Sequence, residues 1–146
     1  MTEISKNTDL PGARYAIDPV AFAKALILAP LIIAAIGFWA LMIPVFAVLF
    51  GGPLYLIIGT PVLMVYLHYA KGSPSGAALL GFLSVVVCAL PIVLYLSVAG
   101  SFRYWDGIFF WVIFALLFGP LWGGTFGYLY NRWRSDLSRR PLPPLA

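Results

Sequence analysis

The fold is decided by residues 25–70, a stretch that reads ALILAPLIIAAIGFWALMIPVFAVLFGGPLYLIIGTPVLMVYLHYA and contains no Asp, Glu, Lys or Arg. A helix needs about 20 predominantly apolar residues to cross the roughly 30 Å of hydrocarbon in a bilayer. The stretch is therefore long enough for two membrane-spanning helices. Gly51-Gly52-Pro53 is its strongest turn signal, so we expect the division between the two helices there.

Two further stretches, 72–102 and 107–131, also lack these charged residues, and each is long enough for one crossing. Over the whole chain 62% of residues are hydrophobic and 10% are charged, whereas a soluble domain has about 25% charged residues. This composition excludes a soluble globular domain and extensive disorder. The apolar stretches are continuous and do not alternate with a period of two, which excludes a membrane β-barrel. The sequence thus predicts an all-α bundle with four membrane-spanning helices.

We expect a transmembrane domain over 19–131, between an N-terminal tail (1–18) and a basic, proline-rich tail (132–146). The predicted helices are 19–50, 53–70, 74–99 and 106–131. Asp18-Pro19 and Ser73-Pro74 have the residue types preferred at a helix N-cap and at the first helical position. The first helix would be about 48 Å long, so it must tilt, extend by an extra turn or kink at a proline.

The distribution of basic residues predicts the orientation. With four crossings both termini share a side with the loop at Lys71, and the opposite side has Arg103 alone. The first side carries Lys6, Arg14, Lys24, Lys71, Arg132, Arg134, Arg139 and Arg140. Because Lys and Arg accumulate in cytoplasmic loops, both termini should be cytoplasmic.

The charge and targeting features also bear on location and partners. No eukaryotic sorting signal is present, which favours the bacterial cytoplasmic membrane. The net charge of +4 favours attraction to anionic lipid. No soluble face carries the basic stripe that nucleic-acid binding requires, so we expect no nucleic-acid partner.

Residues that could carry chemistry are scarce. No Asp, Glu, Lys or Arg lies near the centre of a predicted helix, where ionisable groups are usually functional. His68 is the only histidine and should lie at the cytoplasmic interface, and Cys88 is the only cysteine. This set is too small for a zinc or copper site or for bis-histidine haem ligation. Ser-His, paired-Asp and HExxH arrangements are also missing. We expect no catalytic residue, metal or cofactor, and no enzymatic activity.

The clearest motif is GPLWGGTFG at 119–127. Gly119, Gly123 and Gly127 are spaced four apart and so share one helix face. Small residues let helix backbones approach closely, which favours packing in lipid. These three glycines are therefore candidate helix-packing residues. The sequence leaves their partner open: an alanine strip in the first helix (Ala21, Ala25, Ala29), the Ala77 and Gly81 face of the third helix, or another chain.

A polar cluster of Arg103, Tyr104, Trp105 and Asp106 lies on the predicted outer side. It could form a small contact site outside the membrane. Alternatively, Asp106 caps the last helix and the aromatic rings anchor it at the headgroups.

Two functions remain open. The leading hypothesis is a small non-catalytic membrane protein that acts by helix packing, as an accessory or assembly subunit of a larger complex or as a homo-oligomer. Its partners would be the lipid bilayer and other membrane subunits or itself. The alternative is a channel or carrier for a small neutral solute, with proline kinks as gates and a polar lining of Tyr55, Thr60, Ser84, Ser97 and Thr125.

Overall fold

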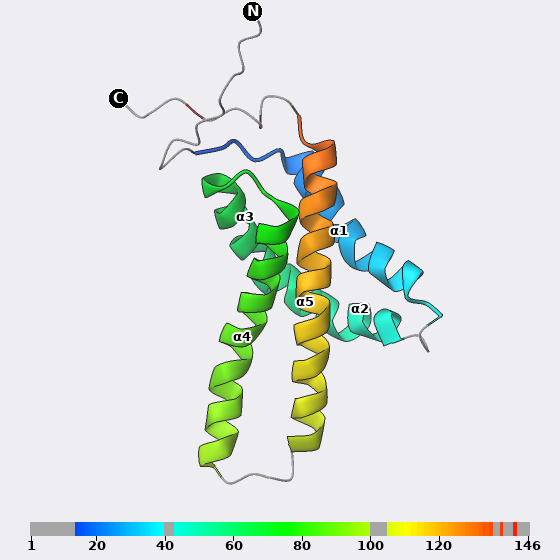
Figure 1. Ribbon diagram of the computed structural model, residues 1–146, viewed down its shortest axis with the longest axis vertical. Coiled ribbons are helices and arrows are strands. Elements are labelled where there is room, and N and C mark those ends of the chain that lie inside the picture. Colours follow the sequence, from blue (N-terminus) through cyan, green and yellow to red (C-terminus); the bar gives the residue numbers. More distant parts are fainter. Residues whose placement is uncertain (1–13, 40–42, 100–104, 136–137, 139–141, 143–146) are drawn as a thin grey trace, which may run out of the picture.

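The computed structural model describes residues 14–39, 43–99, 105–135, 138 and 142 (Figure 1). Over these ranges the regular structure is helical, and no strand occurs. Four helical stretches are long and apolar enough to cross a membrane. The helices are α1 (Pro19–Ile36), α2 (Ile43–Leu54), the π-helical turn η1 (Tyr55–Gly59), α3 (Thr60–Tyr69), α4 (Pro74–Val98) and α5 (Trp105–Trp133). α2, η1 and α3 form one continuous helical stretch, Ile43–Tyr69, which is one of these four. Four such stretches are the pattern of a multi-pass membrane protein.

The predicted division of the first apolar stretch is wrong. α1 ends at Ile36, with Gly37 as its C-cap, and the next helix begins at Ile43. The predicted helix over 19–50 is therefore two helices. The expected turn at 51–53 is instead helical, and the helical stretch continues through it to Tyr69.

Within the helix, the glycine at position 51 serves packing and not a turn. A tight turn at Gly-Gly usually needs a positive φ, yet among the described glycines only Gly72 has one. A Cβ atom on Gly51 would lie 3.2 Å from the indole of Trp122, so Gly51 makes room for that ring. Pro53 deprives the helix of one backbone hydrogen bond, and the π-helical turn that follows it is a known adjustment near such a break.

The first break falls where a glycine and a proline meet. A Cβ atom on Gly37 would lie 2.5 Å from Cγ of Pro44, so the end of α1 lies directly against the start of α2. Pro44 occupies the second position of α2, in the first turn, where its missing N–H costs no helical hydrogen bond. Pro44 is thus at the start of a helix and does not kink one.

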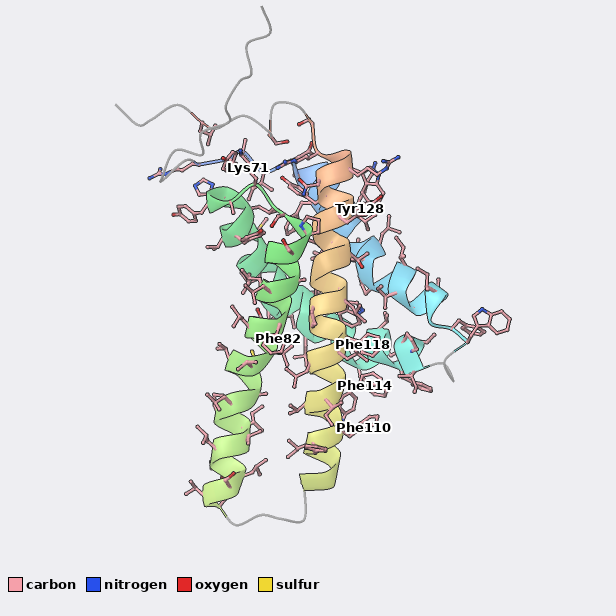
Figure 2. All side chains as sticks on the ribbon, viewed as in Figure 1. Lys71, Phe82, Phe110, Phe114, Phe118 and Tyr128 are labelled. Atoms are coloured by element: carbon pink, nitrogen blue, oxygen red, sulfur yellow. The ribbon has the colours of Figure 1, made fainter. Side chains whose placement is uncertain are left out.

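α4 and α5 form a long antiparallel hairpin (Figure 1). Its register is given by pairs that come close together: Pro74 with Gly127, Ala77 with Gly123, and Gly81 with Gly119. α1, α2 and α3 gather around one half of this hairpin, the half that contains the Lys71 loop (Figures 1 and 2). The other half, which we call the distal half (residues 83–98 of α4 and 107–117 of α5), extends largely beyond them, and Phe50 of α2 reaches it at Trp111.

The main core lies in the covered half. α1 contributes an alanine strip and Phe22, whose ring meets Phe126 of α5 edge-on with centroids 5.4 Å apart. The buried members of this core are Ala21, Phe22, Ala25, Leu26, Ala29, Leu63, Leu67, Ala77, Phe126, Leu129 and Tyr130. A smaller cluster of Ala47, Phe118 and Trp122 joins α2 to α5. α5 is thus the helix on which the others are assembled.

Polar contacts concentrate at the Lys71 end of the hairpin. Asn131 Nδ2 donates to the carbonyl of Gly72 (2.6 Å), and an Arg134 guanidinium nitrogen donates to the carbonyl of Lys71 (2.8 Å). The backbone N–H of Tyr15 donates to the carbonyl of His68 (2.9 Å). These bonds tie the segment before α1, the α3–α4 loop and the end of α5 together.

Candidate functional site

The glycine face of α5 lies against the backbone of α4. A Cβ atom on Gly119 would lie 2.9 Å from the carbonyl oxygen of Gly81, and one on Gly127 would lie 2.8 Å from Cα of Pro74. A Cβ atom on Gly123 would fall deep inside van der Waals contact with the carbonyl of Ala77. Side chains other than hydrogen would therefore force the two helices apart at three successive turns.

The three partners left open by the sequence can now be compared. Each of the three glycines has α4 atoms as the nearest neighbours of its Cβ position. The alanine strip of α1 (Ala21, Ala25 and Ala29) is buried as well, but in the core beside Phe126, Leu129 and Tyr130 of α5. α4 and α1 thus occupy different faces of α5, and the glycine face is taken by α4.

The polar cluster predicted at the outer side falls largely outside the described residues. Arg103 and Tyr104 lie outside them altogether. Trp105 and Asp106 belong to the first turn of α5, but their side chains are also outside the described part. The structure consequently brings no additional residue to this predicted contact site.

A cavity of about 550 Å³ lies between α2, η1, the α4 helix and α5. Its lining is almost entirely apolar. Its side chains that carry a polar atom are those of Tyr55, Ser84, Trp111 and Trp122, besides the thiol of Cys88. Of the five residues named for a solute pathway, Tyr55 and Ser84 line this cavity, and Thr60, Ser97 and Thr125 do not. The hydroxyl of Ser97 donates to the carbonyl of Val93 at 2.7 Å within α4.

Two hydrogen-bond donors are buried at this cavity without a partner among the described residues: the hydroxyl of Tyr55 and Nε1 of Trp122. Their rings meet edge-on, with centroids 5.3 Å apart. Trp122 is 4% exposed. Burying such a group without a partner costs about 1–3 kcal/mol, so a pair of them at one cavity is an unusual feature of the part of the chain that the structure describes.

Sequence reasoning named Tyr55 only as one polar residue of a pathway and missed Trp122. The position of Trp122 in the sequence is a signal that could have identified it. Trp and Tyr in membrane proteins collect at the interfaces, and when they are buried their polar atoms usually form hydrogen bonds. Trp122 lies inside an apolar run and is flanked by the glycine motif, away from either predicted interface. The π-helical turn that begins at Tyr55 is a second signal of this kind, because π-turns are frequent at functional sites, but only the coordinates reveal it.

Asp18 forms the other organised polar site. Its carboxylate accepts from the backbone N–H groups of Val20 and Ala21, both at 3.1 Å, and so caps α1 as the sequence predicted. Its other oxygen accepts from the backbone N–H of Ser135, just past the end of α5 (3.1 Å). The hydrogen bonds from Ala21 and Ser135 hold the pKa of Asp18 below its ordinary value. One carboxylate thus joins the start of α1 to the end of α5.

Groups that could bind a metal were sought among the described residues, and no set of three His, Cys, Asp or Glu lies together there. The ring of His68 is half-buried and meets Tyr69 edge-on, with centroids 5.0 Å apart. Cys88 is a free, exposed thiol on α4. The described residues therefore offer two sites for further argument, the α4–α5 glycine face and the cavity at Tyr55 and Trp122.

The chain matches no protein-family model, no curated protein and no solved structure.

Proposed function

We propose that this chain is a non-catalytic integral membrane protein that acts through helix packing, as an accessory or assembly subunit of a larger membrane complex or as a homo-oligomer. Both termini would lie in the cytoplasm, and the membrane would be the bacterial cytoplasmic membrane, given the eight-to-one distribution of basic residues across the predicted sides. Its surfaces for recognition would lie within the bilayer.

The largely uncovered distal half of the α4–α5 hairpin is the observation that carries this proposal. In α4 only Ala77 is buried, and among the described side chains of α5, from Gly107 onwards, the buried ones begin at Phe118. α1, α2 and α3 gather at the other half (Figure 1). The exposed apolar side chains of the distal half include Leu83, Val87, Leu90, Leu94, Phe109, Phe110, Ile113 and Leu117.

Exposed apolar surface is normal in lipid, so its presence alone does not require a partner. The distal half differs because α4 and α5 stand there largely without a third helix. α2 reaches it where Phe50 meets Trp111 edge-on, with centroids 5.5 Å apart. Helices associate in a bilayer through van der Waals packing, and a further helix seated on this hairpin would gain dispersion contacts along its length. The α4–α5 glycine face is already occupied within the chain, so a partner would use the large side chains around it.

Site-directed photocrosslinking in native membranes tests the proposal. In a Cys88→Ser background, single cysteines at Leu94 and Ile113, both exposed in the distal half, would carry a benzophenone. Matched controls at Ile27 and Leu31 would place the same probe on the exposed face of α1. We expect higher-mass adducts from the distal positions and few from α1. Their mass spectra would distinguish a second copy from a different subunit, and equal yields from all four positions would contradict the proposal.

The second candidate, a carrier or channel for a small neutral solute, is favoured by the cavity and by the placement of Tyr55 and Ser84 on it. The positions of Thr60, Ser97 and Thr125 away from its lining favour the first candidate. Light scattering of proteoliposomes in a glycerol gradient would separate the two. The vesicles should shrink when glycerol is added outside and then regain their volume as glycerol enters. For a packing subunit, we expect this recovery of volume to be no faster than in protein-free vesicles.

A further inference from the structure

The cavity is an elongated groove and not a rounded pocket. Its lining follows α4 from Ala77 to Ile92 and α5 from Ile108 to Gly123, which are sixteen residues, or fifteen helical rises, on each helix. At 1.5 Å per residue this is a length of roughly 22 Å. That length somewhat exceeds the depth of one leaflet, which is half of the roughly 30 Å hydrocarbon core. The groove therefore has the length of a lipid chain and an apolar lining to match.

The two buried donors without a partner lie near one end of this groove. Tyr55 and Trp122 are close to the end at Ala77 and Gly123. Ser84 lies midway along α4, and towards Ile92 and Ile108 the lining is apolar apart from Cys88 and the half-exposed Trp111. An indole N–H only donates, and the phenol offers a donor that its apolar surroundings leave without an acceptor. A ligand that satisfies both groups must carry an acceptor oxygen at one end of a long apolar body.

The depth of these donors agrees with a lipid ester. Trp122 lies five residues, roughly 8 Å along α5, from Gly127, which packs against Pro74 where α4 begins. The α4 start is next to the polar contacts of the Lys71 loop. The donors thus lie just inside the apolar layer on that side, and the groove runs from them towards the distal half.

A second, shallow crevice continues from the groove to the polar end. It shares Val62 and Leu80 with the groove and runs between α3 and α4. Its remaining lining residues are Pro61, Val65, Tyr66, Tyr69 and Ala70. The crevice therefore reaches the residue before Lys71, so the headgroup of a lipid in the groove has a path to the membrane interface.

We propose that the groove binds one phospholipid of the surrounding bilayer, with an acyl chain lying along α4 and α5 and its ester carbonyl accepting hydrogen bonds from Tyr55 and Trp122. The headgroup leaves through the crevice between α3 and α4. The α4–α5 hairpin and the α2–α3 stretch are then held together in part by a resident lipid. This site is separate from the packing surface of the distal half, and it can be present whichever partner that surface binds.

Native mass spectrometry of protein purified from dioleoyl phosphatidylcholine vesicles into a mild detergent tests the site. Tyr55→Phe and Trp122→Phe each remove one donor and keep a ring, and the double variant removes both. We expect one phospholipid retained by the parent protein, and about five- to tenfold less retention for each single variant, as expected for the loss of one buried hydrogen bond. The double variant should retain almost none.

A filling variant tests the groove independently of the donors. Ala115→Phe puts a ring into the apolar part of the groove, and Ala35→Phe adds the same ring on an exposed face of α1. We expect loss of the lipid only with Ala115→Phe. Helix content from circular dichroism identifies any variant that fails to fold. If a variant does fail, the unmodified protein provides a second readout through a phosphatidylcholine that carries a photoreactive diazirine at its acyl terminus. Its crosslinks should concentrate at Ile92 and Ile108.

Four results would overturn the proposal. The first is equal retention by the double variant, the filling variant and the parent protein. The second is crosslinks spread evenly between groove residues and the exposed Leu94. The third is a retained free fatty acid in place of a phospholipid, because the headgroup assignment would then be wrong. The fourth is recovery of a lipid-free protein whose groove residues crosslink to a partner helix.

Discussion

Gly81 of α4 and Gly119 of α5 face each other so closely that a Cβ atom on Gly119 would lie 2.9 Å from the carbonyl oxygen of Gly81. The same approach is repeated one turn away at Ala77 and Gly123, and again at Pro74 and Gly127. In lipid, where apolar side chains gain little by leaving the solvent, this backbone proximity is what makes the hairpin favourable. The hairpin in turn forms one wall of the groove at Tyr55 and Trp122.

Replacing Gly123 by Ala should destabilise the protein in detergent, although Ala is the better helix former. The added methyl group meets the carbonyl of Ala77 and must separate α4 from α5. We expect a loss of about 1–3 kcal/mol, the usual cost of overpacking, and a larger loss for Gly123→Leu. Thermal unfolding followed by circular dichroism measures it.

Gly124 provides the matched control for this experiment. A Cβ atom there would lie 3.4 Å from Cβ of Ala78, which is ordinary contact. Gly124→Ala should therefore be neutral or slightly stabilising. If Gly123→Ala proves as harmless as Gly124→Ala, close backbone packing does not hold the hairpin.

Gly72 should be intolerant of substitution for a different reason. It has a φ of +69° in the α3–α4 loop, and a Cβ atom there would lie 2.5 Å from Leu67 Cδ2. The left-handed conformation alone costs a non-glycine residue about 1–2 kcal/mol, so Gly72→Ala should lower the unfolding temperature. Gly107→Ala is the control, because nothing lies within 4 Å of a Cβ atom there. Equal unfolding temperatures for the two variants would contradict this account.

Acid should weaken the junction between α1 and α5 through Asp18. Its pKa is lowered in the folded protein by the hydrogen bonds from Ala21 and Ser135. A group with a depressed folded pKa stabilises the fold above its unfolded pKa, and this contribution is lost as the pH falls through the folded value. The loss should therefore occur below about pH 4, close to the ordinary Asp value.

Asp18→Ala removes both the cap and the link to Ser135, so we expect a loss of about 1 kcal/mol at neutral pH. Asp18→Asn retains an acceptor oxygen for the cap but cannot titrate. The unfolding temperature measured from pH 7 to pH 3 should fall less steeply for either variant than for the parent protein. Parallel pH profiles for all three proteins would show that the Asp18 charge has no part in stability.

Reporter fusions test the topology. Fusions at the N-terminus and at Ala146 should read cytoplasmic, and a fusion near Ser101 should read external, because eight of nine basic residues lie on the predicted inner side. Moving the first break from 51–53 to the region after Ile36 leaves the number of crossings even, so the expected result is unchanged. Termini on opposite sides would mean that one of the four helical stretches does not cross.

The sequence alone determined the class of the protein, the number of apolar helical stretches and several helix starts. A long continuous apolar run can satisfy its backbone hydrogen bonds in hydrocarbon only as a helix. Asp18 and Ser73 cap helices through contacts that are local in the chain. The four-residue spacing of Gly119, Gly123 and Gly127 likewise places them on one face by helix geometry alone.

Only the tertiary structure decided which breaks were used and which faces met. Gly51-Gly52-Pro53 has the composition of a turn, yet it lies in a helix, and there Gly51 packs against the Trp122 indole, 71 residues further along the chain. The Gly37 break depends on contact with Pro44 across the connection. The groove and its two buried donors also arise from α2, η1, α4 and α5 together. Such features follow from packing between distant segments, and a local pattern contains no information about which segments will meet.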